Sequence, residues 1–139
     1  MTAIREVASV AESSIMMLFL GAMSGLRALS AGEQPTDGHR SAWAELADLI
    51  ERSANEPPPA LTAEAILRAG RARLPRTVRQ LVSALEEDSP ESPVIAERIA
   101  DFRALARGEA ISAGSARGLR SACAHMSAIV HAEARRVAS

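Results

Sequence analysis

The sequence predicts an all-α protein: a single-domain bundle of five to six helices joined by short loops. Apolar residues recur at spacings of three and four through most of the chain, and no stretch alternates apolar and polar residues as a strand would. Segments rich in proline and glycine separate the periodic regions. With 139 residues, 47% of them hydrophobic, the chain can bury one core, so we treat residues 1–139 as one helical domain.

The first predicted helix covers residues 3–29. One apolar stripe runs along it over roughly seven turns. The stripe consists of Ile4, Val7, Ala11, Ile15, Leu18, Ala22, Leu26 and Leu29. A second stripe of Met16, Leu20 and Met23 lies on another side, so the middle of the helix is apolar almost all round. Such a helix is central in its own bundle or shared with a partner, and we take Met16, Leu20 and Met23 as the candidate oligomer interface.

A loop is expected over residues 30–40, with Ser41 as the N-cap of a second helix that ends near residue 54. Its buried stripe is expected to contain Trp43, Leu46, Ala47 and Ile50. Three consecutive prolines at 57–59 stop this helix, and Thr62 begins a third helix that weakens at Gly70.

Three more helices are expected in the second half of the chain. The first covers residues 75–88, with Pro75 at its first position and a stripe of Val78, Leu81, Val82 and Leu85. The next begins at Ser92 and Pro93 and ends before Gly108, with a stripe of Ile95, Ile99, Phe102, Leu105 and Ala106. The last begins near Gly114, with a stripe of Leu119, Cys123, Met126, Val130, Ala134 and Val137.

Small residues recur every fourth position in the first and last helices. They are Gly21 and Gly25, then Gly114, Gly118 and Ala122, and then Ala124, Ala128 and Ala132. This spacing predicts close packing of helices inside one bundle. The alternative is a homodimer seam, formed by the methionine-rich middle of the first helix and the small-residue face of the last.

Composition excludes several classes of function. The 16 basic residues, all arginine, and 17 acidic residues give a net charge of -1, which excludes the overall basic excess of a domain that tracks nucleic acid. The aromatic residues are Trp43, Phe19 and Phe102, too few for a platform that stacks bases. A single cysteine, Cys123, rules out an internal disulfide and suits a reducing compartment, so we expect a cytoplasmic protein.

No membrane segment is expected. The apolar run over residues 15–23 is about half the ~20 residues needed to span a bilayer. Glu6 and Glu12 stand where a signal peptide would carry positive charge, so we expect no signal peptide either.

Five arginines crowd an interval without acidic residues, between Glu64 and Glu86. They are Arg68, Arg71, Arg73, Arg76 and Arg79. Such a cluster can hold phosphate groups. The acidic run that follows can instead neutralise it within the fold or across a dimer; its members are Glu86, Glu87, Asp88 and Glu91.

The string LPRTVRQLVSALEED, residues 74–88, resembles the recognition helix of winged helix-turn-helix repressors of the GntR and MarR types. The resemblance covers about a tenth of the chain. It implies groove-facing roles for Arg76, Thr77, Arg79 and Gln80. The preceding segment departs from the pattern, and a helix is expected where the two strands of a wing should follow, so no family is assigned.

Candidates for catalysis or metal binding are few. The last helix contains Cys123, His125, His131 and Glu133, at spacings of two and six that do not share a helix face. Asp37 and His39 fall in the first expected loop, without a recognisable nucleophile. We expect no metal, no cofactor and, on balance, no enzymatic activity, with Cys123 as inert packing.

The leading hypothesis is a non-enzymatic helical interaction module that acts through helix faces, as a homo-oligomer or on a protein partner. The alternative is a small DNA-binding regulator that uses the helical segment from Arg68 to Arg79. An enzyme or ligand carrier built into the bundle stays open, because a cavity cannot be read from a sequence.

Overall fold

The computed structural model describes residues 2–55, 75–89 and 93–138. These residues form five helices and no strand, which confirms the predicted all-α class. The helices are α1 (Thr2–Ser30), α2 (Asp37–Ala54), α4 (Arg76–Asp88), α5 (Val94–Ala106) and α6 (Ala113–Ala138). The predicted third helix, which begins at Thr62 and weakens at Gly70, lies outside the described residues.

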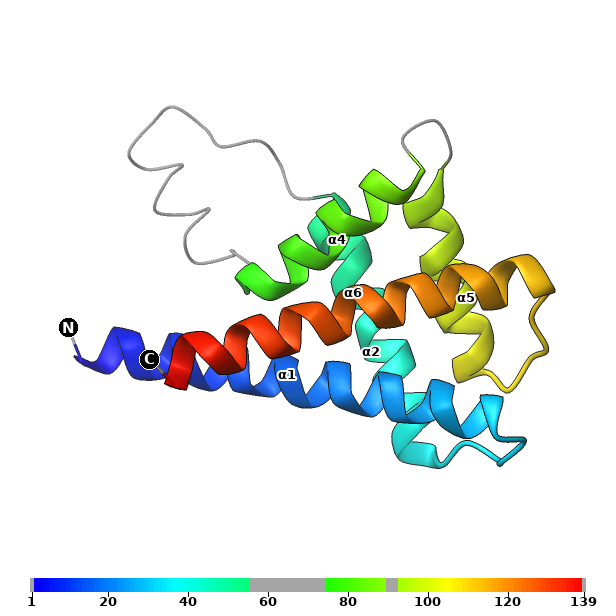
Figure 1. Ribbon diagram of the computed structural model, residues 1–139, viewed down its shortest axis with the longest axis horizontal. Coiled ribbons are helices and arrows are strands. Elements are labelled where there is room, and N and C mark those ends of the chain that lie inside the picture. Colours follow the sequence, from blue (N-terminus) through cyan, green and yellow to red (C-terminus); the bar gives the residue numbers. More distant parts are fainter. Residues whose placement is uncertain (1, 56–74, 90–92, 139) are drawn as a thin grey trace.

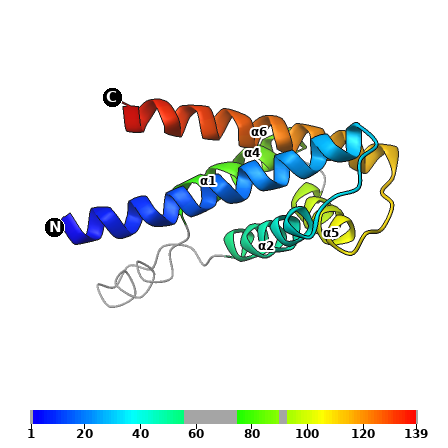
Figure 2. The ribbon, with the colours of Figure 1, turned by 90° about the horizontal axis from the view of Figure 1, so that it is seen from below.

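The two longest helices, α1 and α6, run side by side in opposite directions along the long axis (Figure 1). Helices α2 and α5 pack against each other, and α2 also packs against α1. Helix α4 contacts α6, α2, α5 and α1. The N-terminal turns of α1 and the C-terminal turns of α6 project beyond α2 and α5, as the rotated view also shows (Figure 2). None of the described helices combines the length and apolar character needed to cross a lipid bilayer.

The core is one cluster of buried residues to which all five helices contribute, and Trp43 is its largest member. The indole Nε1 of Trp43 donates a hydrogen bond to the backbone oxygen of Ala22, at 3.1 Å. A Cβ on Gly25 would lie 2.5 Å from the indole ring, so only glycine lets α1 and α2 approach this closely. The spacing of Gly21 and Gly25 therefore serves packing within the chain: Gly21 likewise faces Ala42 of α2.

The predicted start of the second helix was wrong by five residues. Helix α2 begins at Asp37, and its N-cap is Thr36 rather than Ser41. The hydroxyl of Thr36 accepts from the backbone N of His39 at 3.1 Å, while Nδ1 of His39 accepts from the backbone N of Thr36 at 3.2 Å. This reciprocal arrangement is a capping box, in which histidine replaces the usual Glu or Gln. His39 is therefore part of a helix cap.

Candidate functional site

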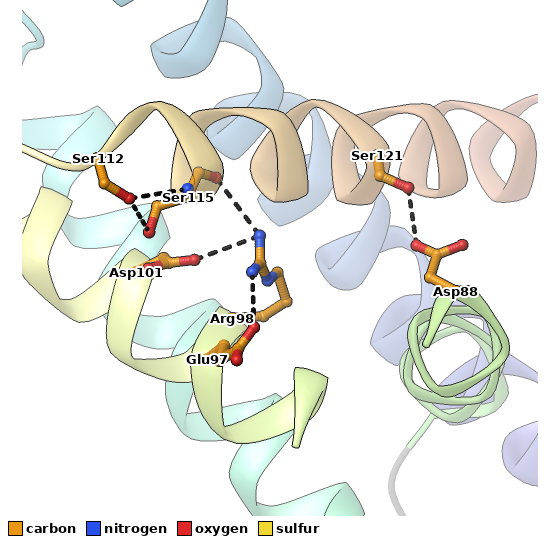
Figure 3. A network of polar contacts seen from close by, with 7 residues as sticks. All are labelled: Asp88, Glu97, Arg98, Asp101, Ser112, Ser115 and Ser121. Carbon is orange, nitrogen blue, oxygen red and sulfur yellow. Dashed lines mark hydrogen bonds and ion pairs between the residues drawn. The ribbon is translucent and has the colours of Figure 1, made fainter. Parts of the chain in front are cut away.

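Helix α6 is fixed by polar contacts with α4 and α5, and its other side faces α1. The first contact involves Arg98 of α5, which is 5% exposed (Figure 3). Its Nη1 lies 3.3 Å from Oδ2 of Asp101 and donates to the backbone oxygen of Ser115 on α6 at 3.4 Å. Its Nη2 lies 3.3 Å from Glu97 Oε2. A buried guanidinium thus joins α5 to the first turns of α6.

Gly118 makes room for this guanidinium. A Cβ at position 118 would lie 1.2 Å from Nη1 of Arg98 and 2.0 Å from its Cζ. The absence of a side chain at position 118 of α6 therefore leaves the space that the Arg98 guanidinium occupies. Of the predicted stripe of α5, Phe102 and Leu105 are buried, and Ile95, Ile99 and Ala106 are half-buried against the core. The prediction missed Arg98 and Asp101, which are also buried.

The second contact joins the end of α4 to the middle of α6. Ser121 Oγ donates to Asp88 Oδ2 at 2.7 Å, and Nε2 of His125 lies 3.0 Å from Asp88 Oδ1 (Figure 3 shows the serine contact). The hydrogen bond from Ser121 is the main cause that lowers the pKa of Asp88, with a smaller contribution from His125 and partial opposition from burial. Ser121 and His125 both donate to the carboxylate of Asp88, so Ser121 is not positioned as a nucleophile activated by histidine.

The third contact lies at the other end of α4. Glu133 of α6 is 7% exposed and forms ion pairs with Arg76, at 2.7 Å, and with Arg136. The hydrogen bond from Arg136 is the main cause that lowers the pKa of Glu133, and Arg76 adds to it. A carboxylate that pairs with Arg76 thus comes from α6.

The predicted anion site is only partly described. Arg68, Arg71 and Arg73 lie outside the described residues. Gln80 is exposed, while Arg79 is half-buried and its Nε lacks a hydrogen-bond partner among the described residues.

The groove-facing role that the repressor resemblance implies for Thr77 is wrong. Thr77 is fully buried, because it lies on the same helical face as the core residues Val78 and Leu81. A buried side chain cannot reach a base edge. Helix α5 stands where the strands of a wing would follow α4.

The predicted oligomer residues divide between core and surface. Met23 is 2% exposed and packs in the core of its own chain, so it is not available to a second copy. Met16 is half-buried, and Leu20 is 43% exposed. The neighbouring Met17 is 68% exposed, and it was not predicted because it belongs to neither apolar stripe.

A groove of about 700 Å³ lies between the C-terminal end of α1 and the N-terminal half of α6. Its apolar lining includes Leu26 and Leu29 from α1, Leu119 from α6 and Ile111 from the segment before α6. Most of its other lining residues are small. The groove is therefore mainly apolar, and no local pattern in the sequence indicates it.

The charged residues in the groove are Arg27 and Arg120, one from each helix. Both are exposed, and neither forms a hydrogen bond or ion pair through its side chain with another described residue. Cys123 also lines the groove; burial raises the pKa of its thiol, and the charge of Arg27 opposes this only in part. Unpaired positive charge thus borders an apolar surface.

The other titratable candidates from the sequence are engaged elsewhere. Asp37 pairs with Arg40 at 2.6 Å in the first turn of α2, and Nδ1 of His131 lies 2.7 Å from the backbone oxygen of Ser127. Among the described residues, no three His, Cys, Asp or Glu side chains are grouped closely enough to hold a metal ion.

Comparison of the chain with protein-family models, with curated proteins and with solved structures finds no match.

Proposed function

We propose that this protein is a non-enzymatic helical interaction module that pairs with a second copy of itself through the outer face of α1 and α6. We define this outer face by Met17, Leu20, Ala124 and Ala128. The observation that carries the proposal is the exposure of Met17 and Leu20 in the middle of α1, at 68% and 43%. Association with a partner that removes exposed apolar surface of this kind from water is favourable in free energy.

These four residues belong to one surface. Arg27 and Ala124 line the same groove, so their sides of α1 and α6 adjoin. Leu20 precedes Arg27 by seven residues and therefore lies on the same side of α1, and Met17 lies next to Leu20 because it precedes it by three residues. On α6, Ala128 follows Ala124 by four residues. Ala124 and Ala128 are both exposed, and their small side chains let another helix approach closely.

The oligomeric mass of the full chain tests this proposal. Light scattering after size exclusion should give a dimer at micromolar concentration, and Leu20→Glu should give a monomer with its helical circular dichroism preserved, because an unpaired charge is costly in an apolar interface. Ser83→Glu is the matched control, since Ser83 is exposed on α4, away from this face. A monomeric unmodified chain, or a dimer that Leu20→Glu leaves intact, would overturn the proposal.

No described observation favours the nucleic-acid alternative. Thr77 is buried and Arg76 is paired with Glu133. Arg79 and Gln80 share a shallow hollow with the carboxylate of Glu87, which repels phosphate.

A further inference from the structure

We propose that the groove between α1 and α6 is a binding site for an amphiphilic anion, a long-chain carboxylate. In this site the hydrocarbon chain lies along Leu26, Ile111 and Leu119, and the carboxylate pairs with Arg27 and Arg120. The inference goes beyond the interaction module. Ala124 belongs to both surfaces, but Leu20 lies outside the groove lining, so the two proposals can be tested separately.

The size of the groove favours a small molecule over a protein. Its volume of about 700 Å³ lies within the range of about 300–1,000 Å³ that is usual for ligand pockets. Twelve described residues line it, whereas a stable protein interface takes about 20–30 residues from each side.

The charges favour an anion. Arg27 and Arg120 line the groove from opposite helices and no acidic residue lines it among the described residues. An arginine without a carboxylate partner can form charge-assisted hydrogen bonds with a ligand carboxylate. Helix α6 also begins at Ala113, close to the lining residue Ala116, so the positive end of its dipole lies near the groove.

The opposing dipole, at the C-terminal end of α1, is reduced by local hydrogen bonds. Gly32 adopts a φ of +77° and turns the chain back on the helix end. The backbone N of Gly32 then donates to Leu29 at 3.1 Å, and that of Glu33 donates to Ala28 at 2.8 Å. These carbonyl oxygens are therefore occupied and present less negative charge to a ligand.

The apolar lining requires the ligand to have a hydrocarbon chain. A small hydrophilic anion would leave the leucines and Ile111 in contact with water, whereas a chain removes that surface from water. A second copy is a poor occupant, because two grooves that met about a two-fold axis would bring four unpaired arginines together.

Titration of the full chain with dodecanoate, followed by calorimetry, tests the site. We expect saturable binding that weakens by about fourfold for each methylene removed from the ligand, the usual consequence of burying less hydrocarbon. Arg27→Gln and Arg120→Gln should each weaken dodecanoate binding by about tenfold through loss of a charge-assisted hydrogen bond. Arg117→Gln is the matched control, because Arg117 is exposed on α6 and does not line the groove.

Two further measurements locate the ligand. Bound dodecanoate should slow the reaction of Cys123 with a thiol reagent, since this side chain lines the groove. The cation dodecyltrimethylammonium should neither bind with comparable affinity nor protect the thiol, because the arginines repel it. Leu20→Glu should leave dodecanoate affinity unchanged, so a failed dimer and a failed ligand site give different results.

Several results would overturn the proposal. The first is the absence of saturable binding up to about millimolar dodecanoate, because a dissociation constant above that concentration corresponds to a negligible affinity. Equal binding of dodecyltrimethylammonium, or unchanged affinity in both groove arginine variants, would show that the groove does not select a carboxylate. A change of oligomeric mass in Arg120→Gln without a change in dodecanoate binding would make the groove a protein interface. Cosedimentation with phosphatidylglycerol vesicles in place of dodecanoate binding would make it a membrane contact.

Discussion

The substitution Gly118→Ala should destabilise the protein, although alanine is the better helix former. The new methyl group would occupy the space of the Arg98 guanidinium, 1.2 Å from Nη1. Because the clash also reaches Cζ at 2.0 Å, the guanidinium has to shift as a whole and we expect it to lose its contact with Asp101. Asp101, which is 9% exposed, would then be left without its ion-pair partner.

The expected magnitude follows from two opposing effects. Breaking a buried ion pair costs about 3–5 kcal/mol of the free energy of unfolding, because one charge stays buried without compensation. Replacing glycine by alanine inside a helix returns about 1 kcal/mol. Gly118→Ala should therefore lower the free energy of unfolding by about 2–4 kcal/mol.

Urea unfolding, followed by the fluorescence of Trp43, measures this change, since Trp43 is fully buried and is the one tryptophan of the chain. Gly114→Ala is the matched control: its Cβ would meet only Ser112 Oγ at 3.8 Å, so it should be neutral or stabilising by up to about 1 kcal/mol. In the Arg98→Met background, Gly118→Ala should cost little, because the guanidinium is already absent. A Gly118→Ala protein as stable as the unmodified chain would refute the reasoning.

Two further predictions concern titratable groups. Asp88 has a folded pKa below its ordinary value of 3.8, so its contribution to stability is present above about pH 4 and is lost as the pH falls through the folded pKa. Asp88→Asn should therefore lower the urea midpoint at pH 6, and the difference from the unmodified chain should shrink as the pH falls below 3.8; a difference that does not shrink would contradict this. Burial raises the pKa of the Cys123 thiol, so Cys123 should react more slowly with a thiol reagent at pH 7.5 in the folded protein than in urea, and Cys123→Ala should fold normally. Equal labelling rates in the two states would show that the thiol is not protected.

Local signals in the sequence were sufficient for most helices. The predicted range of residues 75–88 matches α4 within one residue, and all four residues of its predicted stripe are buried. All four predicted inner residues of α2 are also fully buried, although the cap formed by Thr36 and His39 places the start of the helix closer to the N-terminus than predicted. Helical period and proline breaks depend on residues within a few turns of one another, so they can be read without knowing the partner helices.

The polar interior of α5 could have been found in part. Val94, Arg98, Asp101 and Leu105 recur at spacings of four, three and four, the same period as an apolar stripe. The charges of Arg98 and Asp101, however, are typical of a solvent-facing position. Only the approach of α6 at Gly118 supplies the backbone oxygen of Ser115 and the space that make burial of Arg98 possible.

The sequence by itself determined the all-α class, the apolar faces of the helices and the scarcity of catalytic groups, because these follow from residue type and short-range spacing. Tertiary structure decided that Met23 is buried while Leu20 is exposed, that Glu133 pairs with Arg76, and that α1 and α6 enclose a groove with unpaired arginines. Each of these depends on which helix lies beside which, over separations of tens of residues. The period of a helix shows which side chains share a face, but only packing decides whether that face meets a core, a charge or water.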